Sequence, residues 1–162
     1  MKYLGNYCDW INDEWIDIIN SQPGKRVPQE QDIDKNDYIF DVNNSFNHVY
    51  YEQYDSEYSD NIKLTPSWPM YSNFEWWIVK QTTGMLIPMH QDEFESGRIH
   101  KRYWMPFQDY TPGHIFLYED KLITDYKKGD LFEFDDNLAV HYSGNASYST
   151  RIVLQISAWE YV

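Results

Sequence analysis

The 162-residue sequence is poor in cysteine, in basic residues and in long apolar runs. Cys8 is the only cysteine, so the chain alone can form neither an intrachain disulfide nor a zinc site built from thiolates. Lys and Arg number 13 against 26 Asp and Glu, and the net charge of -13 argues against nucleic acid or an anionic membrane as a partner. No run of about 18 apolar residues suggests a membrane span, and the first residues lack the apolar stretch of a secretory signal. We therefore expect a cytoplasmic protein.

Aromatic side chains, in contrast, are abundant: the sequence has 15 Tyr, 8 Phe and 7 Trp. Disordered chains are poor in such residues, so we expect a folded protein whose core is built largely from rings. The length predicts one compact domain. Trp68, Trp76, Trp77 and the tyrosines of residues 50–58 could also form an aromatic platform for a substrate, but core packing and lid contacts are the favoured interpretation.

The N-terminal part, residues 1–73, is expected to be a helical and irregular extension. Residues 9–20 place apolar side chains on one stripe, which predicts a surface helix that packs on the outside of the core. Asp9 is the expected N-cap, and the Ser-Gln-Pro-Gly run at residues 21–24 ends the helix. Residues 24–73 show no clean period, apart from a possible short strand at residues 38–42.

From residue 74 onward, short runs of β-branched and aromatic residues alternate with turn-forming residues, which is typical of an all-β barrel or sandwich. Eight strands in this part of the chain suit a jelly roll. The expected strands are 74–82, 85–91, 101–107, 114–119, 122–126, 130–134, 139–143 and 151–159.

A candidate metal site begins with His90 and Asp92 at the end of the second expected strand. The period of two in a strand puts both side chains on one face, where they could bind one metal ion. Taken alone, this pair is also consistent with a histidine at a strand end beside a solvated carboxylate, without a metal. His141, at the seventh expected strand, supplies a third ligand. Two histidines and one carboxylate on one side of an ion are typical of non-haem Fe(II) sites with open positions.

Arg151 opens the last expected strand, where it shares one face with Val153, Gln155 and Ser157. A solvent-facing cation is the simplest interpretation of an isolated arginine. If this face points into the barrel, however, Arg151 needs an anionic partner, because a buried unpaired charge is costly. A dicarboxylate that binds the metal at its other end would supply that partner through a guanidinium-carboxylate pair.

These residues resemble, in order and placement, the motif of the 2-oxoglutarate- and Fe(II)-dependent oxygenase superfamily, which has the double-stranded β-helix fold. The resemblance covers residues 74–160. It implies that His90, Asp92 and His141 bind Fe(II). It also implies that Arg151 holds the distal carboxylate of the cosubstrate 2-oxoglutarate.

Within the superfamily, the chain is most similar to the aspartyl/asparaginyl β-hydroxylase group. Residues 101–107, KRYWMPF, resemble that group's third strand, in which an arginine helps to hold the other end of the cosubstrate. Arg102 matches this arginine, and Trp104 stands in place of the group's histidine and would pack beside the cosubstrate. An exposed basic cluster with Lys101 is the alternative for Arg102. The closing Ile156-x-x-Trp159 also resembles the group's last strand.

The sequence thus predicts a dioxygenase that uses Fe(II), 2-oxoglutarate and molecular oxygen, and hydroxylates an amino-acid side chain in a peptide, protein or small molecule. One alternative is a cupin-type metalloenzyme that does not use 2-oxoglutarate. Another is a non-catalytic jelly-roll module that binds carbohydrate. The remaining histidines, His48, His100 and His114, are interpreted as ordinary surface or turn residues.

Overall fold

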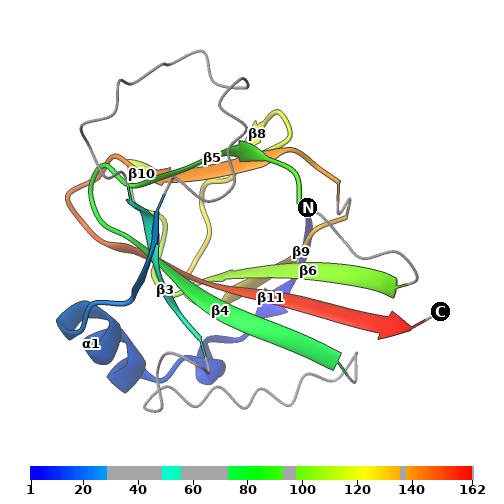
Figure 1. Cartoon of the computed structure of the whole chain (residues 1–162), viewed down its shortest axis with the longest axis horizontal. Helices are drawn as coiled ribbons and strands as arrows, with labels where there is room; N and C mark the ends of the chain where they lie inside the picture. The colour runs from blue at the N-terminus through cyan, green and yellow to red at the C-terminus, as the bar shows by residue number, and fades with distance from the viewer. Residues whose placement is uncertain (29–48, 56–72, 93–97, 136–137, 162) are drawn as a thin grey trace.

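The structure is a computed structural model of the whole chain, and it describes residues 1–28, 49–55, 73–92, 98–135 and 138–161. In this part of the chain, two antiparallel β-sheets face each other, and one α-helix lies outside them (Figure 1). No helix among the described residues is long and apolar enough to cross a membrane.

The larger sheet has seven strands in the order β1-β9-β6-β11-β4-β3-β2. In chain order they are β1 (Lys2–Asn6), β2 (Lys25–Pro28), β3 (Val49–Tyr54), β4 (Asn73–Gln81), β6 (Arg98–Pro106), β9 (Asp130–Glu133) and β11 (Arg151–Tyr161). The longest strand, β11, lies at the centre and pairs with β4 on one side and β6 on the other. Its neighbours therefore fix the position of every β11 side chain.

The smaller sheet has four strands in the order β5-β10-β7-β8. They are β5 (Leu86–His90), β7 (His114–Tyr118), β8 (Lys121–Leu122) and β10 (His141–Asn145). Two antiparallel sheets packed in this way form a double-stranded β-helix, or jelly roll. This is the mainly β fold that the sequence predicts.

Each of the eight expected strands has a counterpart, and the differences lie at the strand ends. The strand expected at 122–126 shortens to β8, because Asp125 adopts a left-handed conformation (φ 61°) that cannot continue a strand. Strands β1, β2 and β3 were not expected; β1 and β2 form the two edges of the larger sheet. The strand expected at residues 38–42 lies outside the described residues.

The expected helix at residues 9–20 is divided into a 3-10 turn at Cys8–Trp10 and helix α1 at Asp13–Ser21. The prediction of Asp9 as the N-cap is wrong. The backbone is extended at Ile11, and the side chain of Asn12 caps α1 by accepting a hydrogen bond from the Glu14 N–H. The helix ends at Ser21, as expected.

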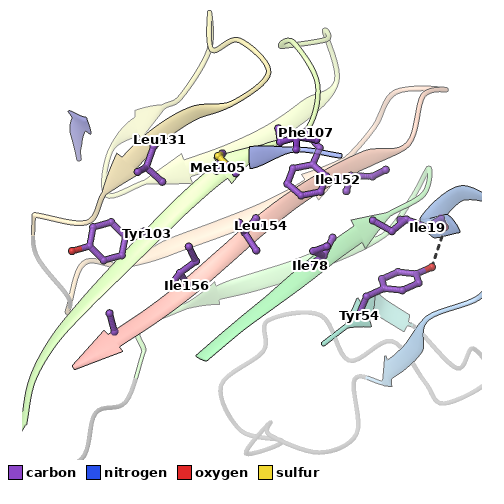
Figure 2. Close-up of a cluster of buried hydrophobic side chains, with 12 residues drawn as sticks. Ile19, Tyr54, Ile78, Tyr103, Met105, Phe107, Leu131, Ile152, Leu154 and Ile156 are labelled. Carbon is purple, nitrogen blue, oxygen red and sulfur yellow. Dashed lines mark hydrogen bonds between the residues drawn. The ribbon is translucent and has the colours of Figure 1, made fainter. Parts of the chain in front are cut away.

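One apolar core lies between α1 and the outer face of the larger sheet (Figure 2). Alternate residues of β11, Ile152, Leu154 and Ile156, point into it and are almost fully buried. Ile19 of α1 is completely buried against this face. The amphipathic stripe of the helix therefore packs as the sequence predicts.

A second core fills the space between the two sheets. Val79, Trp104 and Val153 come from the larger sheet, and Phe116 and Tyr118 come from β7. Both faces of β11 are thus buried, and its second face points to the interior, where the candidate site residues lie.

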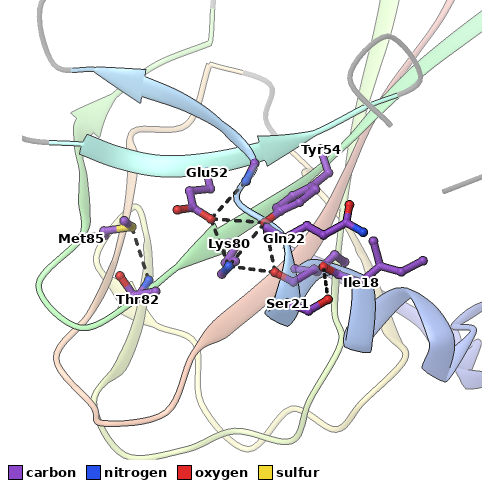
Figure 3. Close-up of polar contacts among 10 residues, drawn as sticks. Ile18, Ser21, Gln22, Glu52, Tyr54, Lys80, Thr82 and Met85 are labelled. Carbon is purple, nitrogen blue, oxygen red and sulfur yellow. Dashed lines mark hydrogen bonds and ion pairs between the residues drawn. The ribbon is translucent and has the colours of Figure 1, made fainter. Parts of the chain in front are cut away.

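A buried polar network fastens the C-terminal end of α1 to β3 and β4 (Figure 3). The Nζ of Lys80 donates to the carbonyl of Ile19 at 2.8 Å and pairs with Glu52 Oε2 at 3.0 Å. The Tyr54 hydroxyl donates to the carbonyls of Ile19 and Gln22 at 3.0 and 2.6 Å. These bonds satisfy carbonyls at the helix end that lack helical partners.

We expect Lys80→Met to destabilise the protein by about 3 to 5 kcal/mol, because it leaves the Glu52 carboxylate buried without its cation. Chemical denaturation at pH 7 measures this loss. Lys121→Met, at an exposed position, is the matched control and should change stability by less than about 0.5 kcal/mol. An equally small effect at Lys80 would show that the network contributes little.

The same network predicts a pH dependence. Burial raises the pKa of Glu52, but the ion pair with Lys80 and the bonds from Gly24 N–H and the Tyr54 hydroxyl outweigh it and hold the pKa below its usual value. Because the folded-state pKa is depressed, this stabilisation is present above the ordinary pKa of the carboxyl group and is lost as the pH falls below it. The stability difference between wild type and Glu52→Gln should therefore shrink from pH 7 to pH 3. A difference that stays constant would contradict this account.

Candidate functional site

A cavity of about 160 Å³ lies between the two sheets. Its walls combine the candidate metal ligands, two arginines and several apolar side chains. The lining residues include Trp77, Val79, Ile87, His90, Asp92, Arg102, Phe116, His141, Ser143, Arg151 and Gln155. All the sequence-predicted site residues except Trp104 are among them.

The two histidines are brought together by strand pairing. His90 ends β5 and His141 begins β10, where they are direct partners, and their ring centroids are 4.4 Å apart. The Nδ1 of His90 is 2.7 Å from the carbonyl of Pro88, and the Nδ1 of His141 is 3.0 Å from that of Ala139. Each carbonyl can only accept, so Nδ1 carries the proton and Nε2 keeps its lone pair for a metal.

Asp92 completes the group. Its Oδ1 is 3.8 Å from Nε2 of His90, and its Oδ2 is 3.9 Å from Nε2 of His141. One ligand atom from each of the three residues lies within 4.8 Å of the others, close enough to be drawn onto one ion. Burial lowers the pKa of His141, which favours the neutral imidazole that a metal requires.

Arg102 on β6 lies beside the candidate ligands. Its Nε is 3.0 Å from Oδ2 of Asp92, and its guanidinium carbon is 4.8 Å from the ring centre of Trp77. The side chain is 8% exposed, so the alternative of an exposed basic cluster is wrong. Burial lowers the pKa of Arg102, and the nearby Asp92 carboxylate opposes this effect. The guanidinium is thus held against a candidate metal ligand.

Arg151 is completely buried at the other end of the cavity, so the solvent-facing interpretation is wrong. Its Nη1 donates to Oε1 of Gln81 at 2.7 Å, but Nε and Nη2 have no hydrogen-bond partner. No carboxylate among the described residues pairs with it, and burial lowers its pKa to about 10. Arg151 remains a cation at neutral pH, and its charge has no anionic partner in the part of the chain that the structure describes.

Other buried polar groups surround Arg151. The Tyr126 hydroxyl lies beside the guanidinium and interacts with it. The Trp104 Nε1 and the His114 Nδ1 have no hydrogen-bond partner among the described residues. The ring of Trp104 lies 5.9 Å from the Arg151 guanidinium carbon, and Tyr126 packs edge-on against that ring. Hydrogen-bond donors without acceptors around a buried cation form an environment suited to an anion. Tyr126 could not be singled out from the sequence, because it follows a short strand and belongs to no motif.

Trp104 itself is 1% exposed and stacks on Phe116, with ring centroids 4.8 Å apart. It packs beneath the cavity rather than lining it. The interpretation of His114 as a surface residue is wrong, because it is 1% exposed, and His100 lies within strand β6 rather than in a loop. Trp76 packs in the outer core and Trp77 lines the cavity; His48 and Trp68 lie outside the described residues.

The charge of the cavity opposes that of the whole protein. The net charge of the chain is -13, yet two arginines and one aspartate line the cavity. A divalent metal bound at His90, Asp92 and His141 would make the cavity more positive. A small anion is therefore the ligand class that this cavity favours.

No protein-family model and no curated protein matches the chain. Solved structures that are similar to it are cupin and double-stranded β-helix proteins. The Schizosaccharomyces pombe Cnp3 cupin domain has a TM-score of 0.45 and 11% identity, with coverage of 68% of this chain and 65% of that one. A protein described as a predicted oxalate decarboxylase from Thermotoga maritima has a TM-score of 0.41 and 16% identity, with coverage of 53% and 66%. A cupin 2 conserved barrel domain protein from Salinispora arenicola has values of 0.41 and 11%, with coverage of 67% and 74%.

Similarities this low describe a shared type of fold, and one fold of this kind hosts many activities. The function has to be argued from the site.

We expect the protein to bind one divalent metal ion through His90, Asp92 and His141. His141→Ala should abolish binding of Mn(II) at micromolar concentrations, because it removes one of three ligands. Titration calorimetry measures the stoichiometry and affinity. Asp92→Ala should behave in the same way, whereas the control Asp120→Ala, at an exposed turn, should bind as wild type does. Unchanged affinity in His141→Ala would remove this residue from the site.

Proposed function

We propose that the protein is an Fe(II)- and 2-oxoglutarate-dependent dioxygenase that hydroxylates an amino-acid side chain in a peptide, protein or small molecule. One observation carries the proposal: the buried, unpaired Arg151 lies in the same cavity as His90, Asp92 and His141. A metal site alone would suit many reactions. A metal site facing an anion site suits a ligand that binds both.

The donor set fits Fe(II). Two imidazoles and one carboxylate on one side of an ion leave its other positions open for ligands, as in non-haem Fe(II) oxygenases. The described residues contain no further His, Cys, Asp or Glu side chain in this group. The carbonyls of Pro88 and Ala139 fix both imidazoles with Nε2 toward the site.

The second site fits a carboxylate. A guanidinium with two unsatisfied nitrogens, free of any protein carboxylate among the described residues, can form a bidentate pair with a ligand carboxylate. The apolar lining from Val79, Ile87 and Phe116 suits the methylene chain of a dicarboxylate. 2-Oxoglutarate combines a chelating 2-oxo acid, a short methylene chain and a distal carboxylate.

When bound, Fe(II) and 2-oxoglutarate supply the oxidation: oxygen, 2-oxoglutarate and a substrate C–H group give succinate, carbon dioxide and the hydroxylated product. His90, Asp92 and His141 would hold the metal, and Arg151 would fix the orientation of the cosubstrate. Burial of Arg151 and Phe116 keeps water from that end of the cavity. The substrate itself is proposed to be a peptide or small molecule that is neutral or cationic, because the protein carries a charge of -13.

A second candidate is a cupin-type metalloenzyme that acts on an anionic substrate without 2-oxoglutarate. The ion pair between Arg102 and Asp92 favours this second candidate. In the oxygenase group that the sequence resembles, the matching arginine binds the cosubstrate, whereas here it contacts a candidate metal ligand. Succinate formation from 2-oxoglutarate with Fe(II) and oxygen, with and without candidate peptides, distinguishes the two. If the metal-loaded protein neither forms succinate nor binds 2-oxoglutarate, the dioxygenase proposal is overturned.

Arg151 provides the sharpest test. We expect Arg151→Met to weaken 2-oxoglutarate binding by about 2 to 5 kcal/mol, because the buried charged pair is lost. The ligand-free variant should be at least as stable as wild type, since an apolar side chain removes an unpaired buried charge. Calorimetry with Mn(II)-loaded protein measures binding, and thermal denaturation measures stability.

Arg151→Lys is the companion variant. A lysine keeps the charge but loses the bidentate geometry, so it should bind 2-oxoglutarate more weakly than wild type and more tightly than Arg151→Met. Wild-type affinity in both variants would exclude Arg151 from the anion site.

A further inference from the structure

Gln155 is a polar side chain of the cavity wall for which the described residues supply no hydrogen-bond partner. It lies on the central strand β11, lines the cavity and is half-buried. Its carboxamide makes no hydrogen bond with the described residues. Ser143, another uncharged polar residue of the lining, donates to Oε1 of Gln81 at 3.4 Å. An amide facing a cavity without protein partners is available to a ligand.

Strand register gives the position of this amide. Gln155 is the direct partner of Trp77 on β4 and of Trp104 on β6, so it lies between two indoles. Along β11, Ser157 is the partner of Arg102, which contacts the metal ligand Asp92. Gln155 and its cross-strand partners therefore lie next to the metal end of the cavity, one position along the same face of the sheet from Arg102.

The other direction along β11 leads to the anion site. Val153 pairs with Val79, and beyond them Arg151 pairs with Gln81. From one end to the other, this face thus presents a cation, an apolar row, the amide of Gln155 and the row of Arg102. A ligand that matches this order has an anionic end, an apolar middle and a polar end beside the metal.

We propose that Gln155 is a specificity-determining residue, whose carboxamide donates a hydrogen bond to the metal-side carboxylate of a bound 2-oxo dicarboxylic acid. The inference rests on the proposed function and deepens it. Gln155 would take the position that the resemblance gave to Arg102. The Nε of Arg102 forms an ion pair with Asp92 at 3.0 Å, and its guanidinium packs on Trp77.

The chemistry of the amide supports this assignment. A carboxylate bound to a metal through one oxygen keeps lone pairs that need donors in a buried site, and the NH₂ group of glutamine supplies two. The methylene chain of the ligand would lie over the valine row, where no donor is needed. A ligand without an acceptor at the metal end would leave the amide of Gln155 unsatisfied, which lowers its affinity.

The test compares 2-oxoglutarate binding to Mn(II)-loaded wild type, Gln155→Leu and Gln155→Glu by titration calorimetry. Gln155→Leu should weaken binding about tenfold or more, because it removes a hydrogen bond to a charged group. Gln155→Glu should weaken it further, since two carboxylates then face each other. In the absence of 2-oxoglutarate, the Mn(II) affinity of Gln155→Leu should stay within about twofold of wild type, because Gln155 is not one of the candidate ligands.

Gln53→Leu is the matched control. This glutamine on β3 is not among the cavity residues, and its amide donates to Asp55 at 2.7 Å. It should bind 2-oxoglutarate as wild type does. If Gln155→Leu does not fold, Gln155→Glu, which keeps the size and polarity, decides the question.

The outcomes separate the two proposals. If metal-loaded wild type does not bind 2-oxoglutarate, the proposed function fails and this inference fails with it. If wild type binds and both Gln155 variants bind within twofold of it, the inference alone is overturned. Loss of 2-oxoglutarate binding with intact Mn(II) binding in the variants supports it.

Discussion

The burial of β11 on both faces is the constraint on which the rest of the structure depends. A strand alternates its side chains, so burying both faces requires an apolar set on one side and residues compatible with the interior on the other. Ile152, Leu154 and Ile156 meet this demand against α1. The opposite face begins with Arg151, and pairing with β4 and β6 fixes where each of its residues meets the cavity. The core and the candidate site are therefore two faces of one strand, and a shift in register by one residue would exchange them.

Arg151 is the costly member of this arrangement. Desolvation lowers its pKa to about 10, and the neighbouring Tyr126 side chain opposes this effect only in part. Among the described residues, the guanidinium donates a hydrogen bond to the neutral Oε1 of Gln81, and no carboxylate pairs with it. A protein gains no stability from an unpaired buried cation, so the cost has to be offset by a ligand that supplies the missing charge. Stability is given up locally to prepare a site, which is common where binding or catalysis takes place. Lys80 is the contrasting case, because a buried carboxylate, Glu52, already pairs with it inside the protein.

Local patterns in the sequence predict the jelly roll, the packing of the helix and the meeting of His90, Asp92 and His141. Alternation and turn chemistry are local, and the spacing of the ligands follows the strands. The pairing of Arg102 with Asp92 could not be predicted in this way, because it depends on contacts between β6 and the segment after β5. Tyr126 and Gln155 belong to no sequence motif. Their proposed roles follow from the side chains that surround them in the folded protein, and these surroundings cannot be read from the sequence. The cap at Asn12 was missed because a single extended residue, Ile11, delays the start of the helix.

The contrast between a charge of -13 and a cation-rich cavity has a consequence for selectivity. At physiological ionic strength, charges on the surface act over about 8 Å, so the acidic exterior influences what approaches but has little effect on a ligand already buried. Inside the cavity, Arg151 is shielded from solvent and its pairing with a carboxylate is screened much less. A large polyanion meets only the exterior and is repelled. A small dianion can enter the cavity and reach charges that the exterior does not cancel. On the proposed function, the net negative charge of the chain and the two arginines of the cavity would together favour a small anion inside and a neutral or cationic substrate outside.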